Sequence, residues 1–380
     1  MARMIYADNA ATTPLDADAF AAMLPYLQSE YANASEPYSF ARTAKAALRA
    51  SRETIAACIN ADPEEIFFTS GGTESDNWAL KGTMFVYGDH RTLITSQIEH
   101  HAVLHSAGAI ERMGYPVAYL PVDSKAIVLP ETLSGIISDS TKLVSVMLSN
   151  NEVGTIQPIK ELAAIAHKHG ALFHTDAVQA LGHIPVDVKE LDIDMLSASA
   201  HKFNGPKGIG FLYIKNGTPI LPFNDGGAQE SGRRAGTENV AAIVGMAAAL
   251  KKSCAEIETY SSLMMELESV LLTKLDEAQI DYRRNGGQAH VPGNVSLSFK
   301  GASGEVLLHR LDLKKICVST GSACDSKRTQ ISHVLQAMQL PEEYALGTIR
   351  VSFGRSNTIE DADDIADAII QILNGVLPHN

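Results

Sequence analysis

The sequence predicts an α/β protein in which a mainly parallel sheet, covered by helices on both faces, is joined to a smaller α+β domain. Two observations lead to this prediction. Along the first 240 residues, short apolar runs alternate with stretches of helical spacing, and this alternation is typical of right-handed βαβ units. Beyond residue 240 comes one long helical stretch, after which the alternation resumes.

The predicted elements follow in chain order. Six apolar runs are expected as strands of the main sheet: residues 65–69, 92–96, 143–148, 171–174, 195–199 and 209–214. Helical spacing is clear at residues 159–169, and the stretch 239–278 is expected as a single connecting helix. Two more strands (294–298 and 348–352) and an amphipathic helix (359–373) end the chain. We place the large domain at residues 15–255 and the small domain at residues 1–14 and 256–380.

Composition excludes several classes of protein. Of the 380 residues, 45% are hydrophobic, which is too many for a disordered chain and enough for a large buried core. The 31 Lys+Arg and 44 Asp+Glu residues give a net charge of −13. A phosphate backbone is not attracted to an acidic protein, so we expect a soluble protein that does not bind nucleic acid directly.

The cysteines and the apolar stretches suggest where the protein works. Four cysteines (Cys58, Cys254, Cys317 and Cys324) show no C-x-x-C pair, so we expect neither a disulfide framework nor a structural zinc site. The first residues lack the apolar core of a signal peptide, and the longest membrane-like stretch, 241–250, is about half the length that spans a bilayer. We therefore expect a cytoplasmic protein without a membrane segment and without a metal.

The first candidate site follows the first predicted strand. In parallel sheets, ligands bind beyond the carboxyl ends of the strands. The glycine pair in Ser70-Gly71-Gly72-Thr73 lets backbone amides approach an anion at the start of a helix, which favours a phosphate. Walker and Rossmann glycine spacings are absent. The alternative is an ordinary helix start in which Thr or Ser is the N-cap.

Polar side chains also follow the next three strands. His100 could stack on a flat ligand or move a proton, and Asn151 could donate to a phenolic or carboxylate oxygen. Asp176 stands at a buried strand end, where a carboxylate needs a cation or several donors, and Gln179 would reach the same ligand. Singly, His100 and Asn151 also fit structural roles, and Asp176 could cap a following helix.

Lys202 follows the strand at 195–199 and precedes a tight Gly-Pro turn. Desolvation and neighbouring positive dipoles are expected to lower its pKa and make the free amine available for a Schiff base. A lone lysine is nearly always a solvated charge. A phosphate cradle, an acid for a ring nitrogen, a ring stacker and an imine-forming lysine together, however, indicate pyridoxal 5′-phosphate.

Three later residues complete the candidate set. Thr237 lies in a glycine-rich, locally basic loop and could add a donor to a phosphate. Cys324 lies among small residues close to Lys327 and Arg328, and these surroundings are typical of a reactive thiolate. Arg350, on a predicted strand, could grip a carboxylate with two parallel hydrogen bonds.

Together these motifs resemble the cysteine desulfurases of the iron–sulfur assembly type, which are class-V aminotransferases of pyridoxal-phosphate fold-type I. The resemblance covers essentially the whole chain. The motifs that carry it are, in order, YADNAATTP, SGGTESDN, EHHAV, NNEVGTIQP, HTDAVQ, SAHKFNGPKGIG, GRRAGTENV, STGSAC and IRVSFGRSNT. The resemblance implies a seven-stranded main sheet and a homodimer.

The resemblance also implies a role for each candidate residue. Lys202 would hold the cofactor as a Schiff base, His100 would stack on its ring and assist proton transfer, and Asp176 would pair with the ring nitrogen. The remaining cofactor contacts would come from Gly72, Thr73, Asn151, Gln179, Ser199 and His201, and from Thr237 of the neighbouring subunit. The substrate carboxylate would bind Arg350 and Asn151, and Cys324 would be the nucleophile and persulfide carrier.

The implied reaction converts L-cysteine to L-alanine and passes the sulfur to an acceptor, such as an iron–sulfur scaffold protein or a thio-cofactor pathway. Two segments depart from the family pattern: residues 32–38, which include Tyr38, replace a Gly-Asn-Pro-Ser-Ser stretch, and residues 325–328 are more charged than usual. The alternatives are a selenocysteine lyase or an aminotransferase on the same scaffold, and a non-catalytic scaffold subunit.

Overall fold

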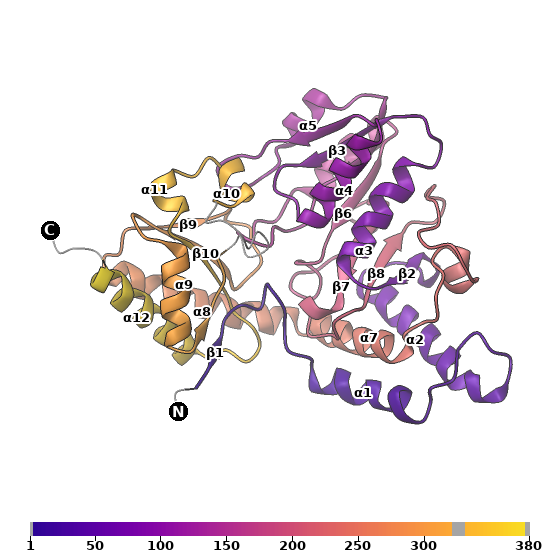
Figure 1. Ribbon diagram of the computed structural model, residues 1–380, viewed down its shortest axis with the longest axis horizontal. Helices are drawn as coiled ribbons and strands as arrows, with labels where there is room; N and C mark the ends of the chain where they lie inside the picture. The colour runs from indigo at the N-terminus through magenta and orange to yellow at the C-terminus, as the bar shows by residue number, and fades with distance from the viewer. Residues whose placement is uncertain (1–2, 321–330, 377–380) are drawn as a thin grey trace.

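The computed structural model describes residues 3–320 and 331–376. Its main sheet has seven strands, as predicted, in the order β2-β8-β7-β6-β5-β3-β4 (Figure 1). These strands are β2 (Ile66–Thr69), β3 (Thr92–Ser96), β4 (Val117–Leu120), β5 (Thr141–Ser145), β6 (Leu172–Asp176), β7 (Met195–Ser199) and β8 (Gly210–Ile214). Strand β8 is antiparallel to β2 and β7, and the other neighbours pair in parallel. The predicted α/β fold is confirmed.

Helices cover both faces of this sheet. One face packs in a common apolar core with α1 (Ala17–Gln28), α2 (Arg42–Cys58), α5 (Pro130–Ile136), α6 (Ile159–Lys168) and α7 (Val240–Ala255). The other face packs against α4 (His101–Arg112) and the π-helical turn η3 (Trp78–Gly82), which continues α3 (Gly72–Asn77). Alternate strand residues supply the two cores: Phe68 points to the first and Phe67 to the second. Burial on both faces explains why these strands are near-continuous apolar runs.

A second, smaller unit has its own core, made by residues 5, 7 and 264–373. It contains an antiparallel sheet of order β12-β10-β9 and a two-stranded parallel pair, β1 with β11. Its elements are β1 (Ile5–Tyr6), α8 (Ile257–Glu277), β9 (Tyr282–Asn285), β10 (Asn294–Phe299), α9 (Gly304–Leu313), β11 (Ile316–Cys317), α10 (His333–Ala337), α11 (Glu342–Ala345), β12 (Thr348–Ser352) and α12 (Ile359–Val376). The separate core supports the predicted domain division, which stays a prediction.

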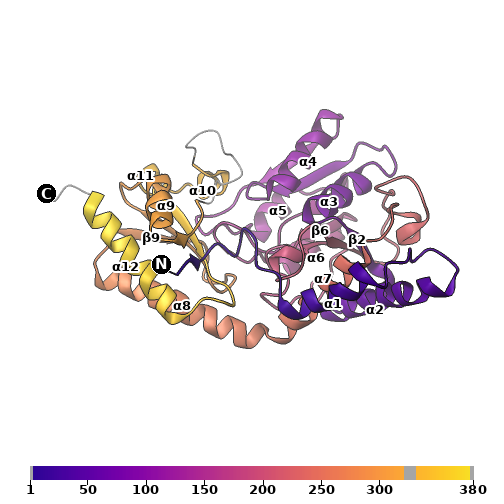
Figure 2. The same ribbon diagram turned by 60° about the horizontal axis from the view of Figure 1, so that its bottom comes forward.

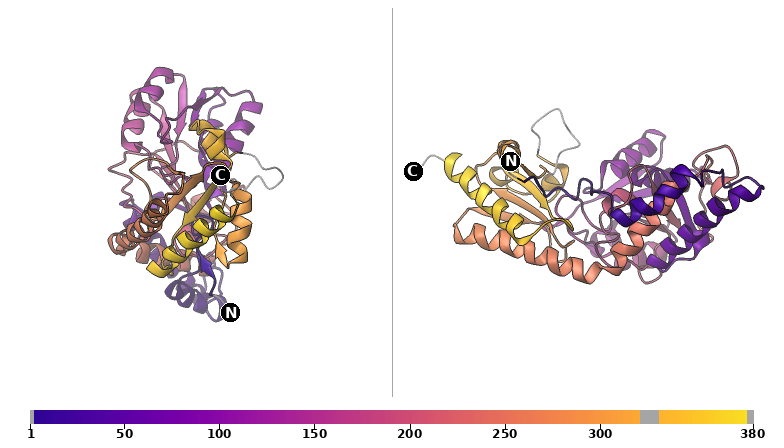
Figure 3. Two further views of the ribbon diagram at one scale, coloured as in Figure 1. Left: turned by 90° about the vertical axis from the view of Figure 1, so that its left-hand side faces the viewer. Right: turned by 90° about the horizontal axis from the view of Figure 1, so that it is seen from below.

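One predicted element is wrong in the structure. The single helix expected over residues 239–278 is two helices, α7 and α8, which meet at Glu256 (Figure 2). Glu256 leaves the helical conformation, with φ −106° and ψ 6°, and its carboxylate pairs with the Arg355 guanidinium. The break lets α8 continue from the main sheet toward the small unit (Figure 3).

The limits of other elements differ less. Strand β5 ends at Ser145, but Val146 and Leu148 still donate backbone hydrogen bonds to His174 and Asp176 of β6, so this part of the predicted strand is an irregular extension of the sheet. No helix in the described ranges combines the length and apolar character needed to cross a membrane.

Candidate active site

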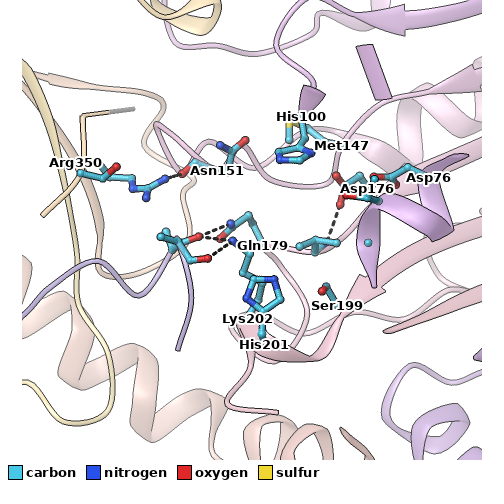
Figure 4. A pocket seen from close by; sticks show the side chains of 16 residues that line it. Asp76, His100, Met147, Asn151, Asp176, Gln179, Ser199, His201, Lys202 and Arg350 are labelled. Carbon is cyan, nitrogen blue, oxygen red and sulfur yellow. Dashed lines mark hydrogen bonds between the residues drawn. The ribbon is translucent and has the colours of Figure 1, made fainter. Parts of the chain in front are cut away.

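A cavity of about 320 Å³ lies where the carboxyl ends of the main-sheet strands face the small unit. It brings together nearly all the predicted site residues, and Figure 4 shows most of them in place. The lining residues are Ala10, Ala11, Gly72, Thr73, Asp76, His100, Met147, Asn151, Asp176, Val178, Gln179, Ser199, His201, Lys202, Ser319 and Arg350. Of the other two candidates, Cys324 lies outside the described residues. Thr237 is exposed and lines a separate open hollow.

The glycine pair after β2 forms a tight, uncapped helix start. Gly71 is the N-cap of α3, with φ +147°, and no described side chain bonds to the first amides. The alternative of a Ser or Thr N-cap is therefore wrong. A Cβ atom at Gly72 would lie 2.7 Å from Cγ2 of Val178, so any side chain at this position would force Val178 to shift.

Lys202 enters the cavity from a short turn, Ala200–Lys202, directly after β7. The turn is closed by a 2.8 Å hydrogen bond from the Gly205 amide to the Ala200 carbonyl. The Lys202 Nζ donates to the carbonyl oxygens of Ala10 (2.6 Å) and Ala11 (2.9 Å). The sequence predicts positive dipoles beside the Lys202 amine. For these two contacts that expectation is wrong, because a carbonyl oxygen is the negative end of its dipole.

Asp176 ends β6 and is 5% exposed. Burial raises the pKa of its carboxyl to about 6, although the Val178 amide and the Lys202 charge act in the opposite direction. Residues 178–180 form a turn and not a helix, so the helix-cap alternative does not apply. Beside it lies Asp76, whose Oδ1 is buried and finds no hydrogen-bond partner in the described part of the chain. Burial, together with the Asp176 charge, raises the Asp76 pKa well above its usual range.

His100 is the N-cap of α4, and its Nδ1 accepts a 3.1 Å hydrogen bond from the Ala102 amide. Because Nδ1 is an acceptor, a neutral ring carries its proton on Nε2. Burial and the nearby Lys202 charge lower the His100 pKa to about 4. The ring is therefore neutral at pH 7 and can hold or donate the Nε2 proton.

Two cofactor candidates contact the N-terminal segment. The Gln179 Nε2 donates to the Ala10 carbonyl (2.9 Å), which also accepts from Lys202. The His201 Nδ1 lies 3.1 Å from Oγ1 of Thr12, and burial lowers the His201 pKa to about 4. These contacts fix the Gln179 amide and the His201 ring against the N-terminal segment.

Arg350, on β12, is 5% exposed. Its Nη1 donates to the backbone carbonyl of Asn151 (2.7 Å), and its Nη2 donates to Oδ1 of Asp8 (2.8 Å). The Nε group is buried and has no partner within the described ranges. An unpaired buried donor of this charge is costly, so the cavity presents a ready contact for an oxyanion.

Comparisons with known proteins identify the family. The model of the aminotransferase class-V family matches residues 5–365. The chain belongs to this family. It is 46% identical over 372 residues to a protein named cysteine desulfurase IscS from Methanosarcina thermophila, covering 98% of this chain and 92% of that protein.

Two solved structures are also similar to this class-V chain. One is titled NifS-like protein: it is 37% identical, has a TM-score of 0.93, and the match covers 98% of this chain and all of that one. The other is titled SspA in complex with cysteine: it is 33% identical, with a TM-score of 0.81, covering 92% of this chain and 98% of that one. The family, the fold and pyridoxal phosphate as the cofactor are thus confirmed as predicted.

The residues that line the cavity also fit pyridoxal phosphate, independently of the comparisons. The uncapped amides at Gly72 and Thr73 suit a phosphate group, and the buried Asp176 carboxyl suits a protonated ring nitrogen. Sequence reasoning missed Asp76 and Asp8, which line or border the same cavity. Asp8 stands in the first of the family motifs, so a signal was present, but nothing in the sequence connected it to Arg350.

Behind the cavity, Glu99 is fully buried. Its Oε1 accepts from the Ser96 hydroxyl (2.6 Å) and the Met147 amide (3.0 Å), and burial raises its pKa from 4.5 to about 8. Between these pH values the folded protein keeps a proton that the unfolded chain releases, so this carboxyl stabilises the fold at low pH and loses that contribution as the pH rises toward 8.

We expect a Glu99→Gln variant to lose this pH dependence. From pH 5 to pH 7, the free energy of unfolding should fall less steeply for the variant than for the wild type. The two slopes should differ by about 1.4 kcal/mol per pH unit. Urea unfolding of both proteins measures the two slopes. His100 and His174, whose lowered pKa values act in the opposite sense, are present in both and cancel in the difference. Equal slopes would show that Glu99 is ionised in the fold.

Proposed function

We propose that this chain is a pyridoxal-phosphate-dependent cysteine desulfurase that converts L-cysteine to L-alanine and carries the sulfur as a persulfide on Cys324. The observation that carries the proposal is the arrangement of one cavity. Lys202 lies between Asp176 and Arg350 in the view of Figure 4, so an amine, an acid for the ring nitrogen and a carboxylate-binding group face the same space. The names of the full-length relatives support this reading.

In this proposal Gly72, Thr73, Ser199 and His201 hold the phosphate, and Asp176 and Gln179 hold the ring. When bound, the cofactor supplies an aldehyde and a protonated ring that withdraws electrons from the substrate α-carbon. Arg350, whose guanidinium donates to the Asn151 backbone carbonyl, would bind the substrate carboxylate together with the Asn151 side-chain amide. His100 covers the site from α4 with a neutral ring.

Residues of the chain then transfer the proton and the sulfur. The Lys202 amine takes the α-proton, for which general base catalysis requires a group within hydrogen-bonding reach. The Cys324 thiolate attacks the substrate sulfur, so that a sulfur–sulfur bond forms while the carbon–sulfur bond breaks and its electrons pass to carbon. Protonation of the carbon completes alanine, and His100 Nε2 and Lys202 are the proton donors in this scheme.

The direct test uses the purified protein loaded with pyridoxal phosphate. With L-cysteine and an excess of a thiol reductant, we expect alanine and sulfide in equal amounts. Release of a keto acid in place of alanine would contradict the proposal and favour an aminotransferase. A much higher kcat/KM for L-selenocysteine would favour a selenocysteine lyase.

We further propose that the protein acts as a homodimer in the cytoplasm and passes sulfur to an acceptor such as an iron–sulfur scaffold protein. Thr237 lies outside the cavity of its own chain, which supports its assignment to the partner's phosphate site. Exposed apolar residues gather near the N-terminal helix, and burial against a second copy would explain them. They are Phe20, Leu27, Tyr31, Tyr38 and Phe40. Light scattering should give twice the mass of one chain.

A further inference from the structure

The segment that follows β1 contacts both Arg350 and Lys202 in the active site. Asp8 accepts a hydrogen bond from Arg350, and the Ala10 and Ala11 carbonyls accept from Lys202. This segment is itself fixed to Ser352, two residues after Arg350 on β12. The Asn9 amide donates to the Ser352 carbonyl (3.0 Å), the Ser352 amide donates to the Ala7 carbonyl (2.7 Å), and the Ala10 amide donates to the Ser352 hydroxyl (2.9 Å).

Asp8 is consequently held in register with Arg350. Its backbone pairs with Ser352 as an isolated bridge, and the Tyr6 hydroxyl closes the turn by donating to the carbonyls of Asp8 (3.0 Å) and Thr12 (2.8 Å). The Asp8 side chain is 20% exposed and that of Arg350 is 6% exposed. This ion pair is therefore largely buried. A buried charged hydrogen bond fixes geometry more strongly than one at the surface.

The hydrogen bonds of Arg350 leave a defined part of its guanidinium for a ligand. A guanidinium has five N–H groups. The contact with the Asn151 carbonyl occupies one on Nη1, and the contact with Asp8 occupies one on Nη2. The Nε N–H is buried and, among the described residues, has no acceptor. The two existing contacts stop the planar group from turning away, so Nε stays available beside the cavity.

The charge around Arg350 also limits what the cavity can accept. Arg350 is the one arginine among the described residues that line it, and its charge is already matched by Asp8. One carboxylate can still bind to the remaining N–H groups. A second anionic group on the same ligand would find the Arg350 charge already paired with Asp8 and no second arginine among the described lining residues.

We propose that Asp8 is a positioning residue that orients Arg350 and restricts the carboxylate subsite to amino acids with an uncharged side chain. The proposal rests on the proposed function, since it takes Arg350 as the group that binds the substrate carboxylate. It separates the two effects of Asp8: its oxygen fixes the guanidinium, and its charge disfavours dicarboxylic amino acids.

Two variants separate these effects in the holoenzyme. Asp8→Asn keeps an oxygen that can accept from Nη2 but removes the charge, and Asp8→Ala removes both. Asp16→Asn is the matched control, because Asp16 is also paired to a cation, Lys252, and lies outside the lining of the cavity. Asparagine also caps a helix as well as aspartate does. Cofactor content and the thermal midpoint of each variant report whether it folds.

The readouts are ligand binding and the split between KM and kcat. Binding of L-alanine and L-aspartate is followed by the change in the visible spectrum of the holoenzyme. We expect Asp8→Asn to lower the ratio of the L-aspartate to the L-alanine dissociation constant about tenfold, the size of one unit charge at several ångströms in a protein. We expect Asp8→Ala to raise the KM for L-cysteine about tenfold with kcat changed less than about twofold, and Asp8→Asn to restore most of that KM.

An unchanged ratio in Asp8→Asn would overturn the charge effect, and a wild-type KM in Asp8→Ala would overturn the positioning effect. If Asp8→Ala does not fold, the binding ratio in Asp8→Asn still decides the proposal. Failure of the proposed function looks different: the wild type would then form no alanine from cysteine, while binding of L-alanine and L-aspartate to the holoenzyme could still be compared.

Discussion

A Lys202→Ala variant is expected to lose at least about 10²- to 10⁴-fold in the rate of alanine formation from L-cysteine. The amine is placed in the cavity by the turn after β7 and is held by the carbonyls of Ala10 and Ala11. The substitution removes both the group that attaches the cofactor and the base that takes the α-proton. Quantifying alanine after incubation of the cofactor-loaded protein measures the loss.

The matched control is Lys207→Ala, since Lys207 lies in the same segment but is exposed and does not line the cavity. We expect its rate to equal that of the wild type. A Lys202→Ala protein that kept the wild-type rate would contradict the assignment of this residue and, with it, the proposed use of the cavity.

The second large effect is expected for Cys324→Ser. A serine hydroxyl is a much weaker nucleophile toward sulfur than a thiolate, so we expect sulfide release from L-cysteine to fall about 10³-fold or more. The residues proposed to hold the cofactor do not include Cys324, so we expect the variant to keep the visible absorption of the bound cofactor. Sulfide is measured colorimetrically in the presence of a reductant.

Cys58→Ser serves as the control, because Cys58 lies at the end of α2 and does not line the cavity. Its rate should be unchanged. An aminotransferase needs no thiol, so a Cys324→Ser protein that still turned over cysteine through a persulfide at the normal rate would exclude the proposed mechanism.

Much of the architecture could be predicted because the main sheet is buried on both faces. Strands β3 and β7 match the predicted limits at both ends, since their apolar runs stop where the polar site begins. Strands β4 and β9 escaped prediction because, unlike the equally short β2, they are only partly buried. The break at Glu256 was missed because both flanking segments have good helical spacing, and its ion pair with Arg355 comes from distant sequence.

The candidate site was predictable for a related reason. Parallel strands bring their carboxyl ends to one edge, so Asp176 and Lys202 could be placed together from the order of strands alone. The partners of Arg350 could not, because Asp8 is 342 residues away in sequence and the contact exists only once the segment after β1 lies beside β12. The sequence also could not show which atom of Asn151 contacts Arg350, and in the structure it is the backbone carbonyl.

The same separation between Asp8 and Arg350 has a consequence for biosynthesis. The N-terminal segment, residues 7–11, contacts Lys202 and Arg350 and leaves the ribosome before the main sheet exists. Arg350 and Ser352, in contrast, are translated near the end of the chain. The main sheet can assemble as the chain emerges, N-terminal portion first, but the N-terminal segment cannot pair with β11 and β12 until these late strands have been translated. A nascent chain therefore carries an incomplete active site, and the protein becomes competent for chemistry only after its synthesis is nearly finished.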